Sequence, residues 1–406
     1  MTGGSSGHPV PADFAGPPTA ADLDRWSEAD RAARPLRLAR IRARLAEAGL
    51  DAYLGVRREN SRYLTGFALR DGEEKVAGHS GQFLVGGDEV VMFADSRYTI
   101  QVGREAPEAR LEPVYGDLVE RWPRIAGSLG ARRIGVEAAF VDHAAWQRLA
   151  GAAPGVELVP VEGWVEEDRA TKEPAELERV AAACAVADRA LAGLLPAIRP
   201  GRTERELALE LGWAMRTGGA EALAFDVACL SGPEAALPHG SPGDRPVLAG
   251  AVLLFDFGAQ VDGYRSDMTR TLFVGEPSPR DLEIYELVAA AQAACIAGLE
   301  AAVRDGIPIT GREADGLARA VIVAAGHGEH FGHGTGHGIG LATHEAPSLG
   351  MRAADAPLPS LTVFSVEPGV YLAGQTGVRI EDLVLFDAAA GRVERLTRFP
   401  RDVIVV

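Results

Sequence analysis

Cysteine is scarce in this sequence, and its scarcity excludes two kinds of site. The 406 residues contain three cysteines, Cys184, Cys229 and Cys295, which are widely spaced and form no CxxC pair. A disulfide framework or a thiolate metal site needs paired or clustered cysteines. We therefore expect a protein of a reducing compartment, and the predicted location is the cytoplasm.

Positive charge and long apolar runs are also in short supply. Lys and Arg number 41 against 57 Asp and Glu, which gives a formal net charge of -16. This balance repels a phosphate backbone, so nucleic acid is not an expected partner. The longest apolar stretch, around 287–303, is interrupted by Gln292 and Glu300, so we expect no bilayer span and no membrane partner.

The chain divides by composition into a tail and two domains. Residues 1–20 are rich in Gly, Pro and Ser, lack the basic start and apolar middle of a signal peptide, and predict a flexible tail. Apolar residues make up 47% of the chain, enough to bury a large core. The sequence pattern changes near Thr171, which predicts a domain boundary there and domains at 21–168 and 169–406.

Helical and strand-like patterns alternate in the first of these domains, which predicts an α/β fold. A helix is expected to begin at Pro35 and to end at Gly49. Strand-like runs follow at 52–56, 83–85, 90–93 and 133–136.

Two long amphipathic helices are predicted in the second domain, with strands and Gly-rich turns between and after them. One starts at Pro174, with Glu176 in its first turn, and the other follows the capping sequence that starts at Ser278. The fold class of the whole chain is therefore predicted as α/β (α+β).

A hairpin is predicted around Asp262-Gly263, which lies between two strand-like runs. With those two residues as the loop, Asp267 lies opposite Gly258, and Asp256 shares its face. The two aspartates are then diagonal neighbours that repel each other unless a cation lies between them. The alternative is that both are ordinary solvent-facing residues, which the apolar run 252–255 before Asp256 disfavours.

A second pair of strand-like runs offers the same arrangement. A loop centred near Gly374 would place Glu367 opposite Glu381, with Arg379 two residues before Glu381 on the same face. Taken alone, each of these acidic residues also fits an edge or a loop of a sheet.

Five of the nine histidines fall between His327 and His344, in a segment with glycine at every second position from 332 to 340. This spacing disfavours a helix and predicts a closely packed strand or loop, with His333 and His337 on one face. Together with His344 they favour a metal or acid/base site over purely structural roles. His239 stands apart in a turn-rich loop.

The runs DFGAQVDGYRSDMTRT, GTGHGIGLATHE, VEPGVY and VRIED together resemble the pita-bread-fold metallopeptidases, which include methionine aminopeptidase, aminopeptidase P and prolidase. The resemblance covers about residues 172–406. ENSRYLTGF at 59–67 and DSRY at 95–98 are similar to the extra, creatinase-like domain of the proline-directed branch.

The resemblance implies a dinuclear metal centre with two divalent ions per chain. Asp267 and Glu381 would bridge both ions, Asp256 would complete one, and His337 with Glu367 would complete the other. Manganese is the expected metal, with zinc or cobalt as alternatives because mixed carboxylate and imidazole ligands suit all three. Relatives also lead us to expect a homodimer.

The resemblance also implies roles around the metals. Glu367 would carry a proton to the leaving nitrogen, His344 and His239 would stabilise the tetrahedral intermediate, and His333 and Arg379 would shape the substrate pocket. Many relatives carry a tyrosine where this chain has Phe225.

We expect hydrolysis of the Xaa-Pro peptide bond, by a dipeptidase of the prolidase type. Arg352 or Arg379 is the candidate for binding the free carboxylate of a dipeptide. The alternatives are an aminopeptidase P, which acts on longer Xaa-Pro peptides, and a binding module that keeps the fold without catalysis.

Overall fold

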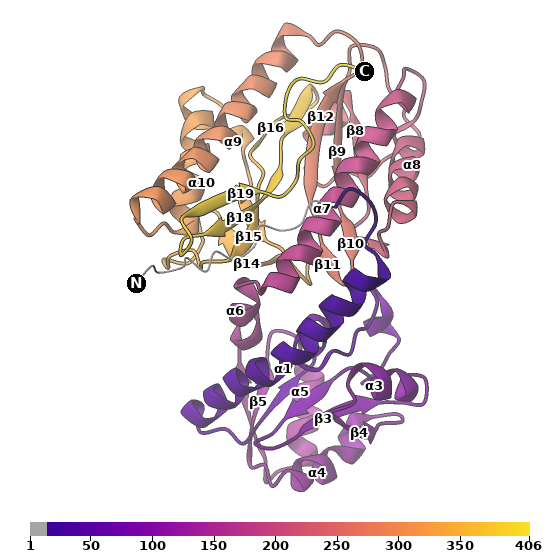
Figure 1. Cartoon of the computed structure of the whole chain (residues 1–406), viewed down its shortest axis with the longest axis vertical. Helices are drawn as coiled ribbons and strands as arrows, with labels where there is room; N and C mark the ends of the chain where they lie inside the picture. The colour runs from indigo at the N-terminus through magenta and orange to yellow at the C-terminus, as the bar shows by residue number, and fades with distance from the viewer. Residues whose placement is uncertain (1–13) are drawn as a thin grey trace. The chain divides into compact units, whose positions relative to one another are not determined.

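The computed structural model describes residues 14–406, which form two compact units (Figure 1). One unit comprises residues 24–169, and the other comprises residues 170–406 together with the described residues up to Leu23. The predicted domain boundary, between residues 168 and 169, lies one residue before the division between Arg169 and Ala170. Of the predicted tail, residues 1–13 lie outside the described part of the chain.

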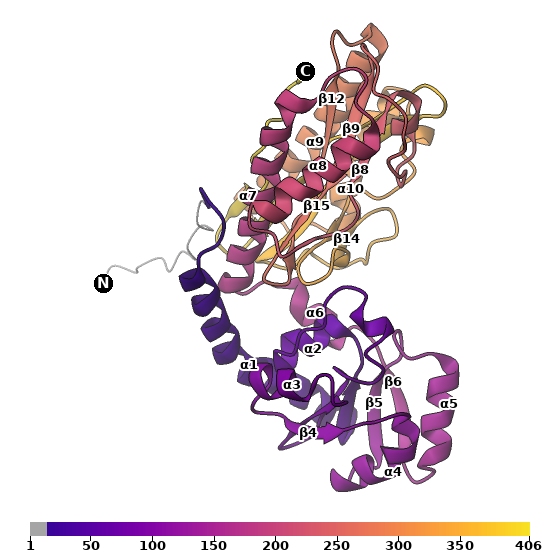
Figure 2. The same cartoon turned by 90° about the vertical axis from the view of Figure 1, so that its right-hand side faces the viewer.

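A mixed six-stranded sheet forms the centre of the 24–169 unit. Its strands, in spatial order, are β4 (Arg110–Pro113), β3 (Val90–Ala94), β2 (Phe83–Val85), β1 (Ala52–Gly55), β5 (Arg133–Glu137) and β6 (Glu157–Val161). The helices are α1 (Ala20–Ala48), α2 (Arg58–Thr65), η1 (Glu73–Lys75), α3 (Thr99–Glu105), α4 (Leu118–Ser128), α5 (His143–Ala152) and α6 (Trp164–Ala170). Figure 2 shows the sheet between α1 on one side and α5 on the other. The predicted strands and the α/β class are confirmed.

The start of α1 corrects one prediction. The helix begins at Ala20, and Pro35 lies inside it instead of opening it. Proline in a helix interior removes one backbone hydrogen bond, but the preceding residues are strong helix formers and the helix has its own cap. Thr19 and Asp22 exchange hydrogen bonds between side chain and backbone there, which satisfies amide groups at the helix start.

The second unit carries two helix pairs and several small sheets. Its helices are α7 (Pro174–Leu194), η2 (Leu195–Ala197), α8 (Glu204–Thr217), η3 (Gly232–Ala236), α9 (Pro279–Asp305), α10 (Gly311–Ala324) and η4 (Gly328–His330). Its first strands are β7 (Ala222–Leu223), β8 (Ala228–Ser231), β9 (Val252–Phe257), β10 (Ala259–Val261), β11 (Tyr264–Arg265) and β12 (Met268–Phe273). The later strands are β13 (Gly336–Gly338), β14 (Glu345–Leu349), β15 (Thr362–Val366), β16 (Gly369–Leu372), β17 (Thr376–Arg379), β18 (Asp382–Asp387) and β19 (Arg392–Arg395).

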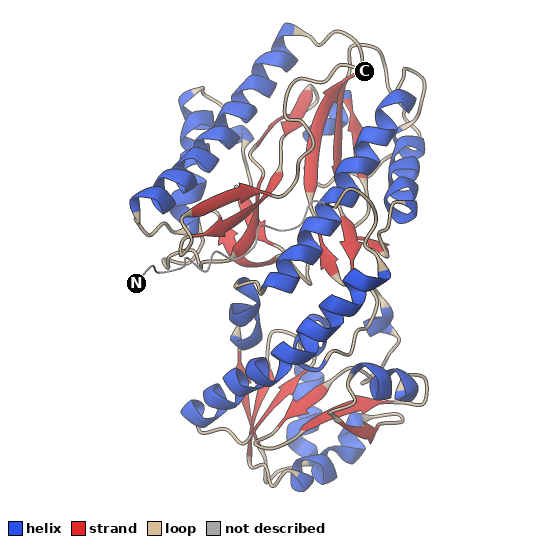
Figure 3. Cartoon of the chain, viewed as in Figure 1, coloured by secondary structure: helices blue, strands red, loops and turns tan. Residues whose placement is uncertain are grey.

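The strands of this unit lie between the two helix pairs (Figures 1 and 3). Helix α7 packs on α8, and α9 packs on α10 and faces β17 and β19. Both predicted helix starts are confirmed, because α7 begins at Pro174 with a capping box and Ser278 caps α9. The core between α9, α10 and the strands includes Val288, Leu299, Ile322, Phe364 and Val384, all buried.

Helices α7 and α9 are also long and apolar enough, by length and composition, to cross a bilayer. This corrects the expectation that polar interruptions exclude any such segment. Core helices meet the same criterion, and α9 has core contacts: the buried amide of Gln292 donates hydrogen bonds to the carbonyl oxygens of Val366 and Ile380.

The first predicted hairpin register is confirmed. Val261 pairs with Tyr264 in the β10–β11 ladder, and Asp256 pairs with Thr269 in the β9–β12 ladder, so the same register places Asp267 opposite Gly258. The turn residues Asp262 and Gly263 both have positive φ, 44° and 81°, as a two-residue hairpin loop requires.

The second predicted hairpin has one register along its whole length. Val366 pairs with Asp382 between β15 and β18, and Gly369 pairs with Arg379 between β16 and β17. Glu367 therefore stands opposite Glu381 in the short gap between the two ladders, as predicted.

Gly258 is a position in the first hairpin where a side chain does not fit. A Cβ there would lie 2.0 Å from the carbonyl oxygen of Ser266 and 2.9 Å from the Cβ of Ala224. We expect Gly258→Ala to lower the free energy of unfolding by about 1–3 kcal/mol, because backbone on the facing strand must move. Urea denaturation measures this. Gly193→Ala is the matched control, because a Cβ at this exposed position of α7 meets nothing within 4 Å; equal losses in both variants would contradict the prediction.

Candidate metal centre

Two hairpins and one short strand bring five side chains of metal-binding type together. Asp256 is on β9 and Asp267 directly precedes β12, whereas Glu367 directly follows β15 and Glu381 directly precedes β18. His337 is the central residue of β13, which pairs with β15. The amide of Glu381 donates to the carbonyl of Thr269, at 3.1 Å, and joins one hairpin to the other.

Close packing of the Gly-rich segment gives His337 its place. A Cβ at Gly336 or Gly338 would lie 1.8 Å or 2.1 Å from a carbonyl oxygen of a neighbouring strand. Only glycine lets these backbones approach so closely. The predicted extended, closely packed conformation is thus confirmed at β13.

Within the described chain, Asp267, His337 and Glu381 each offer a ligand atom such that all three atoms lie within 4.8 Å of one another. His337 Nε2 lies 3.3 Å from an oxygen of Glu367 and 3.7 Å from an oxygen of Asp267. The structure therefore places Glu367 beside this group of three.

The unpaired oxygens of the cluster fit a cation. Asp256 Oδ1, Asp267 Oδ1 and Glu381 Oε1 are buried and have no hydrogen-bond partner among the described residues. Burial raises the pKa of Asp267 and of Glu381 well above the ordinary range, and the charges of the neighbouring carboxylates raise both further. Buried carboxylates that repel one another are stabilised when hard divalent ions bind their oxygens. The residues present therefore fit the predicted dinuclear centre.

The imidazole of His337 has the tautomer and the orientation that a metal ligand needs. Its Nδ1 lies 3.1 Å from the carbonyl oxygen of Gly338, which can only accept, so Nδ1 carries the proton and Nε2 keeps its lone pair. Burial lowers the pKa of His337, so the ring is neutral at neutral pH. This second hydrogen bond fixes the ring and its tautomer, as in most histidine metal sites.

Arg379 lies beside the cluster and is engaged with the protein. Its Nη2 lies 2.5 Å from Asp256 Oδ2, its Nε donates to Thr269 Oγ1 at 2.8 Å, and its Nη1 donates to the Tyr371 hydroxyl at 2.9 Å. The residue is 4% exposed. A guanidinium with three protein partners is suited to orienting Asp256 more than to capturing a substrate carboxylate.

Tyr371 and Thr269 are parts of the site that sequence reasoning undervalued or missed. The hydroxyl of Tyr371 lies 2.9 Å from His333 Nε2, and His333 Nδ1 bonds the carbonyl of Gly334 at 2.7 Å. Thr269 Oγ1 donates to Glu381 Oε2 at 2.7 Å. Thr269 faces Asp256 in the predicted register, so its proximity was available from the sequence, but a threonine in a strand carries no chemical signal of its own.

The other predicted site residues are placed less centrally. The ring centroid of His344 lies 4.2 Å from that of His337. Burial lowers the pKa of His344, and the nearby His337 and His239 lower it further. Phe225 is half-buried, and Arg352 is exposed in the turn after β14. Among the described residues, no hydrogen bond or ion pair joins Arg352 to the cluster.

Two buried cations brace the loop that carries His344. Lys172 and Glu345 form an ion pair at 2.8 Å with both side chains 1% exposed. Arg265 donates to Thr343 Oγ1 and to the carbonyl of Ala224, the residue before Phe225. The segments of His344 and Phe225 are thus tied to one buried guanidinium, which no local sequence signal indicated.

Removal of metal should make the stability of the protein depend on pH. Because Asp267 and Glu381 have raised pKa values when folded and metal-free, the folded state binds more protons than the unfolded state above about pH 4. The free energy of unfolding of chelator-treated protein should therefore fall as pH rises from that value towards the raised pKa values. Added Mn²⁺ should abolish this decline, which urea denaturation across pH measures.

Two aspartate variants sharpen that measurement. Asp267→Asn should flatten the decline in the metal-free protein, whereas Asp355→Asn, at an exposed position of the same unit, should leave it unchanged. An identical slope with and without Mn²⁺ would contradict the metal centre.

Comparison with family models identifies both units. Residues 178–388 match metallopeptidase family M24, and residues 37–171 match the creatinase/prolidase N-terminal domain.

Individual relatives resemble the chain over most of its length. An Xaa-Pro dipeptidase from Bacillus anthracis has a TM-score of 0.82 and 34% identity, over 92% of this chain and 100% of that one. An X-Pro aminopeptidase from Thermotoga maritima has a TM-score of 0.80 and 33% identity, over 91% of this chain and 99% of that one. The Xaa-Pro dipeptidase of Pyrococcus horikoshii is 35% identical over 276 residues, 68% of this chain and 76% of its own length. The chain therefore belongs to metallopeptidase family M24, as a hydrolase with a creatinase/prolidase N-terminal domain.

Proposed function

We propose that this protein hydrolyses the Xaa-Pro peptide bond with two divalent metal ions, as a dipeptidase of the prolidase type. The observation that carries the proposal is the convergence of four carboxylates and His337, with three buried carboxylate oxygens that have no hydrogen-bond partner within residues 14–406. Relatives named Xaa-Pro dipeptidase support the substrate class.

The five predicted ligands, Asp256, Asp267, His337, Glu367 and Glu381, would hold the ions. Bound divalent ions would supply Lewis-acid activation of water and of the scissile carbonyl. The part of the protein is to keep the ligands in the required protonation states and orientations. Arg379 and Thr269 hold Asp256 and Glu381, and the Gly338 carbonyl holds the ring of His337.

Proton transfer is assigned to Glu367. Burial raises the pKa of this carboxyl group, a direction that favours its taking up a proton, which it can pass to the leaving imide nitrogen. Ser365 Oγ donates to Glu367 Oε1 at 2.9 Å and so orients this carboxyl group.

The histidines beside the cluster suit stabilisation of a tetrahedral intermediate. His344 is exposed next to His337, and His239 is exposed in the loop after η3. Each can donate a hydrogen bond to a developing oxyanion while remaining in contact with water. Phe225, which lacks the hydroxyl of a tyrosine, would contribute an apolar wall for the proline ring.

Manganese is the proposed metal, and a cytoplasmic homodimer the proposed form of the protein. Both rest on the resemblance described above, supported by the carboxylate-rich ligand set. Three free, buried cysteines are consistent with a reducing compartment.

The runner-up function is that of an aminopeptidase P. It is favoured by the X-Pro aminopeptidase from Thermotoga maritima, whose similarity to this chain nearly equals that of the Bacillus anthracis dipeptidase. It is favoured also by the engagement of Arg379, because that leaves exposed Arg352 as the remaining candidate for a product carboxylate.

Substrate length separates the two functions. With Mn²⁺ present we expect Ala-Pro to be hydrolysed faster than Ala-Pro-Ala, and Ala-Ala, which lacks proline, to be left intact. The release of alanine from each peptide, detected by chromatography, measures all three reactions. Cleavage of the tripeptide with none of Ala-Pro would establish the aminopeptidase instead, and cleavage of neither would refute Xaa-Pro hydrolysis.

The hydroxyl of Tyr371 should matter for turnover. Tyr371→Phe leaves Arg379 Nη1 and His333 Nε2 without their partner, and an unmade buried hydrogen bond costs about 1–3 kcal/mol. We expect kcat/KM for the preferred Xaa-Pro substrate to fall by about tenfold or more.

Tyr285→Phe is the matched control for that variant. Its hydroxyl bonds the carbonyl oxygens of Arg401 and Asp402 and not the metal centre. Equal losses of activity in the two variants would show that the effect of Tyr371 is general destabilisation.

A further inference from the structure

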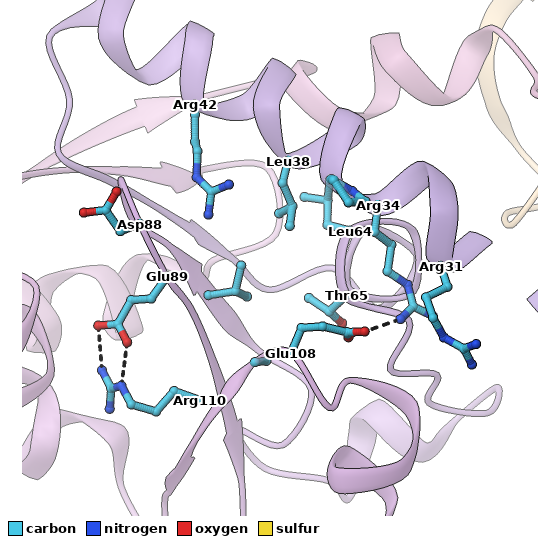
Figure 4. A pocket seen from close by; sticks show the side chains of 13 residues that line it. Arg31, Arg34, Leu38, Arg42, Leu64, Thr65, Asp88, Glu89, Glu108 and Arg110 are labelled. Atoms are coloured by element: carbon cyan, nitrogen blue, oxygen red, sulfur yellow. Dashed lines mark hydrogen bonds and ion pairs between the residues drawn. The ribbon is translucent and has the colours of Figure 1, made fainter. Parts of the chain in front are cut away.

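The 24–169 unit contains a cavity of about 560 Å³ that shares no lining residue with the metal centre (Figure 4). This volume is within the range of small-molecule sites. Helix α1, helix α2, the turn before β3 and the segment before β4 line it. Its function is not explained by hydrolysis at the metal centre.

One face of α1 supplies the wall of this cavity. Arg34, Leu38 and Arg42 recur every four residues and therefore lie along one side of the helix. Arg34 and Arg42 are about 12 Å apart along the axis, at 1.5 Å per residue. Figure 4 shows Leu38 and Arg42 directed into the cavity, with Leu64 beside Arg34. The wall thus offers two guanidinium groups with an apolar surface between them.

The two arginines are incompletely satisfied by the protein. Arg34 Nε is buried and has no hydrogen-bond partner among the described residues. Arg34 Nη1 donates to the carbonyl of Glu105 at 3.3 Å and lies 3.7 Å from a carboxylate oxygen of Glu108, whose side chain is 61% exposed. Arg42 donates from Nε to the carbonyl of Gly86 at 3.1 Å. In the described part of the chain, neither Nη group of Arg42 has an ion-pair partner. Burial lowers the pKa of Arg34, although the charge of Glu108 acts in the opposite direction.

The formal charges of the residues that line the cavity indicate the charge of its ligand. Four arginines and three carboxylates line it, a formal excess of one positive charge in a chain of net charge -16. Arg110 is already paired with Glu89 through two contacts, at 2.8 Å and 3.2 Å. A single carboxylate would match the excess, whereas a phosphate dianion would be repelled by Asp88 and Glu108 at the rim.

We propose that this cavity binds a small organic monoanion, a carboxylate joined to an apolar body, as in an N-acylated amino acid or a short peptide. The carboxylate pairs with the open fork of Arg42, which suits two parallel hydrogen bonds. The apolar body covers Leu38 and Leu64. The site is independent of the proposed peptidase function.

N-acetyl-leucine is the probe, titrated into the metal-loaded protein by isothermal calorimetry. N-acetyl-leucinamide, which has the same body without the charge, should bind at least about tenfold more weakly. Arg42→Gln should weaken binding of N-acetyl-leucine by a similar factor and leave Xaa-Pro hydrolysis unchanged. Arg104→Gln, at an exposed arginine of the same unit outside the cavity, should bind like the wild type.

Several outcomes would overturn the site. These are no binding at about 10 mM probe, equal binding of the amide, or binding that survives Arg42→Gln, since the metal centre also attracts carboxylates and is intact in that variant. If Arg42→Gln does not fold, Leu38→Glu gives the same test by placing a negative charge against the ligand: retained binding in that variant would also refute the proposal.

Discussion

Repulsion among buried carboxylates is the constraint around which the catalytic unit is organised. Burial raises the pKa values of Asp267, Glu381 and Glu367, and the charges of neighbouring carboxylates raise those of Asp267 and Glu381 further. Such a cluster costs free energy in the metal-free protein and is stabilised when divalent ions bind the free oxygens. The fold thus carries a local destabilisation that bound divalent ions would offset.

Hairpins meet this constraint because they place side chains by register. Each of the two hairpins holds a pair of acidic residues at fixed cross-strand positions, and the Glu381–Thr269 backbone hydrogen bond aligns one hairpin with the other. Helices α9 and α10 pack on the strands and supply apolar burial that offsets the cost of the cluster. Precision at the site thus comes from backbone pairing, and stability comes from the surrounding core.

Around the ligands, a polar network fixes what the metals would contact. Arg379 joins Asp256, Thr269 and Tyr371, and Tyr371 joins His333. The same logic, a guanidinium held between several acceptors, recurs at Arg265 beneath the loops of His344 and Phe225. In the N-terminal unit, Arg34 Nε and the Nη groups of Arg42 instead have no acceptor in the part of the chain that the structure describes, which is why that cavity is a candidate for a ligand.

The sequence alone determined the registers of both hairpins, the helix starts at Pro174 and Ser278, and the extended Gly-rich strand, because local turn, capping and alternation rules govern them. The start of α1 was predicted wrongly, since Pro35 gave a strong local signal that the helix formers before it outweighed. Only the tertiary structure decided how the hairpins meet, that Arg379 contacts Asp256, that Lys172 pairs with Glu345 across 173 residues, and that α1 lines a cavity. Those contacts join residues far apart in the chain, and no local periodicity encodes them.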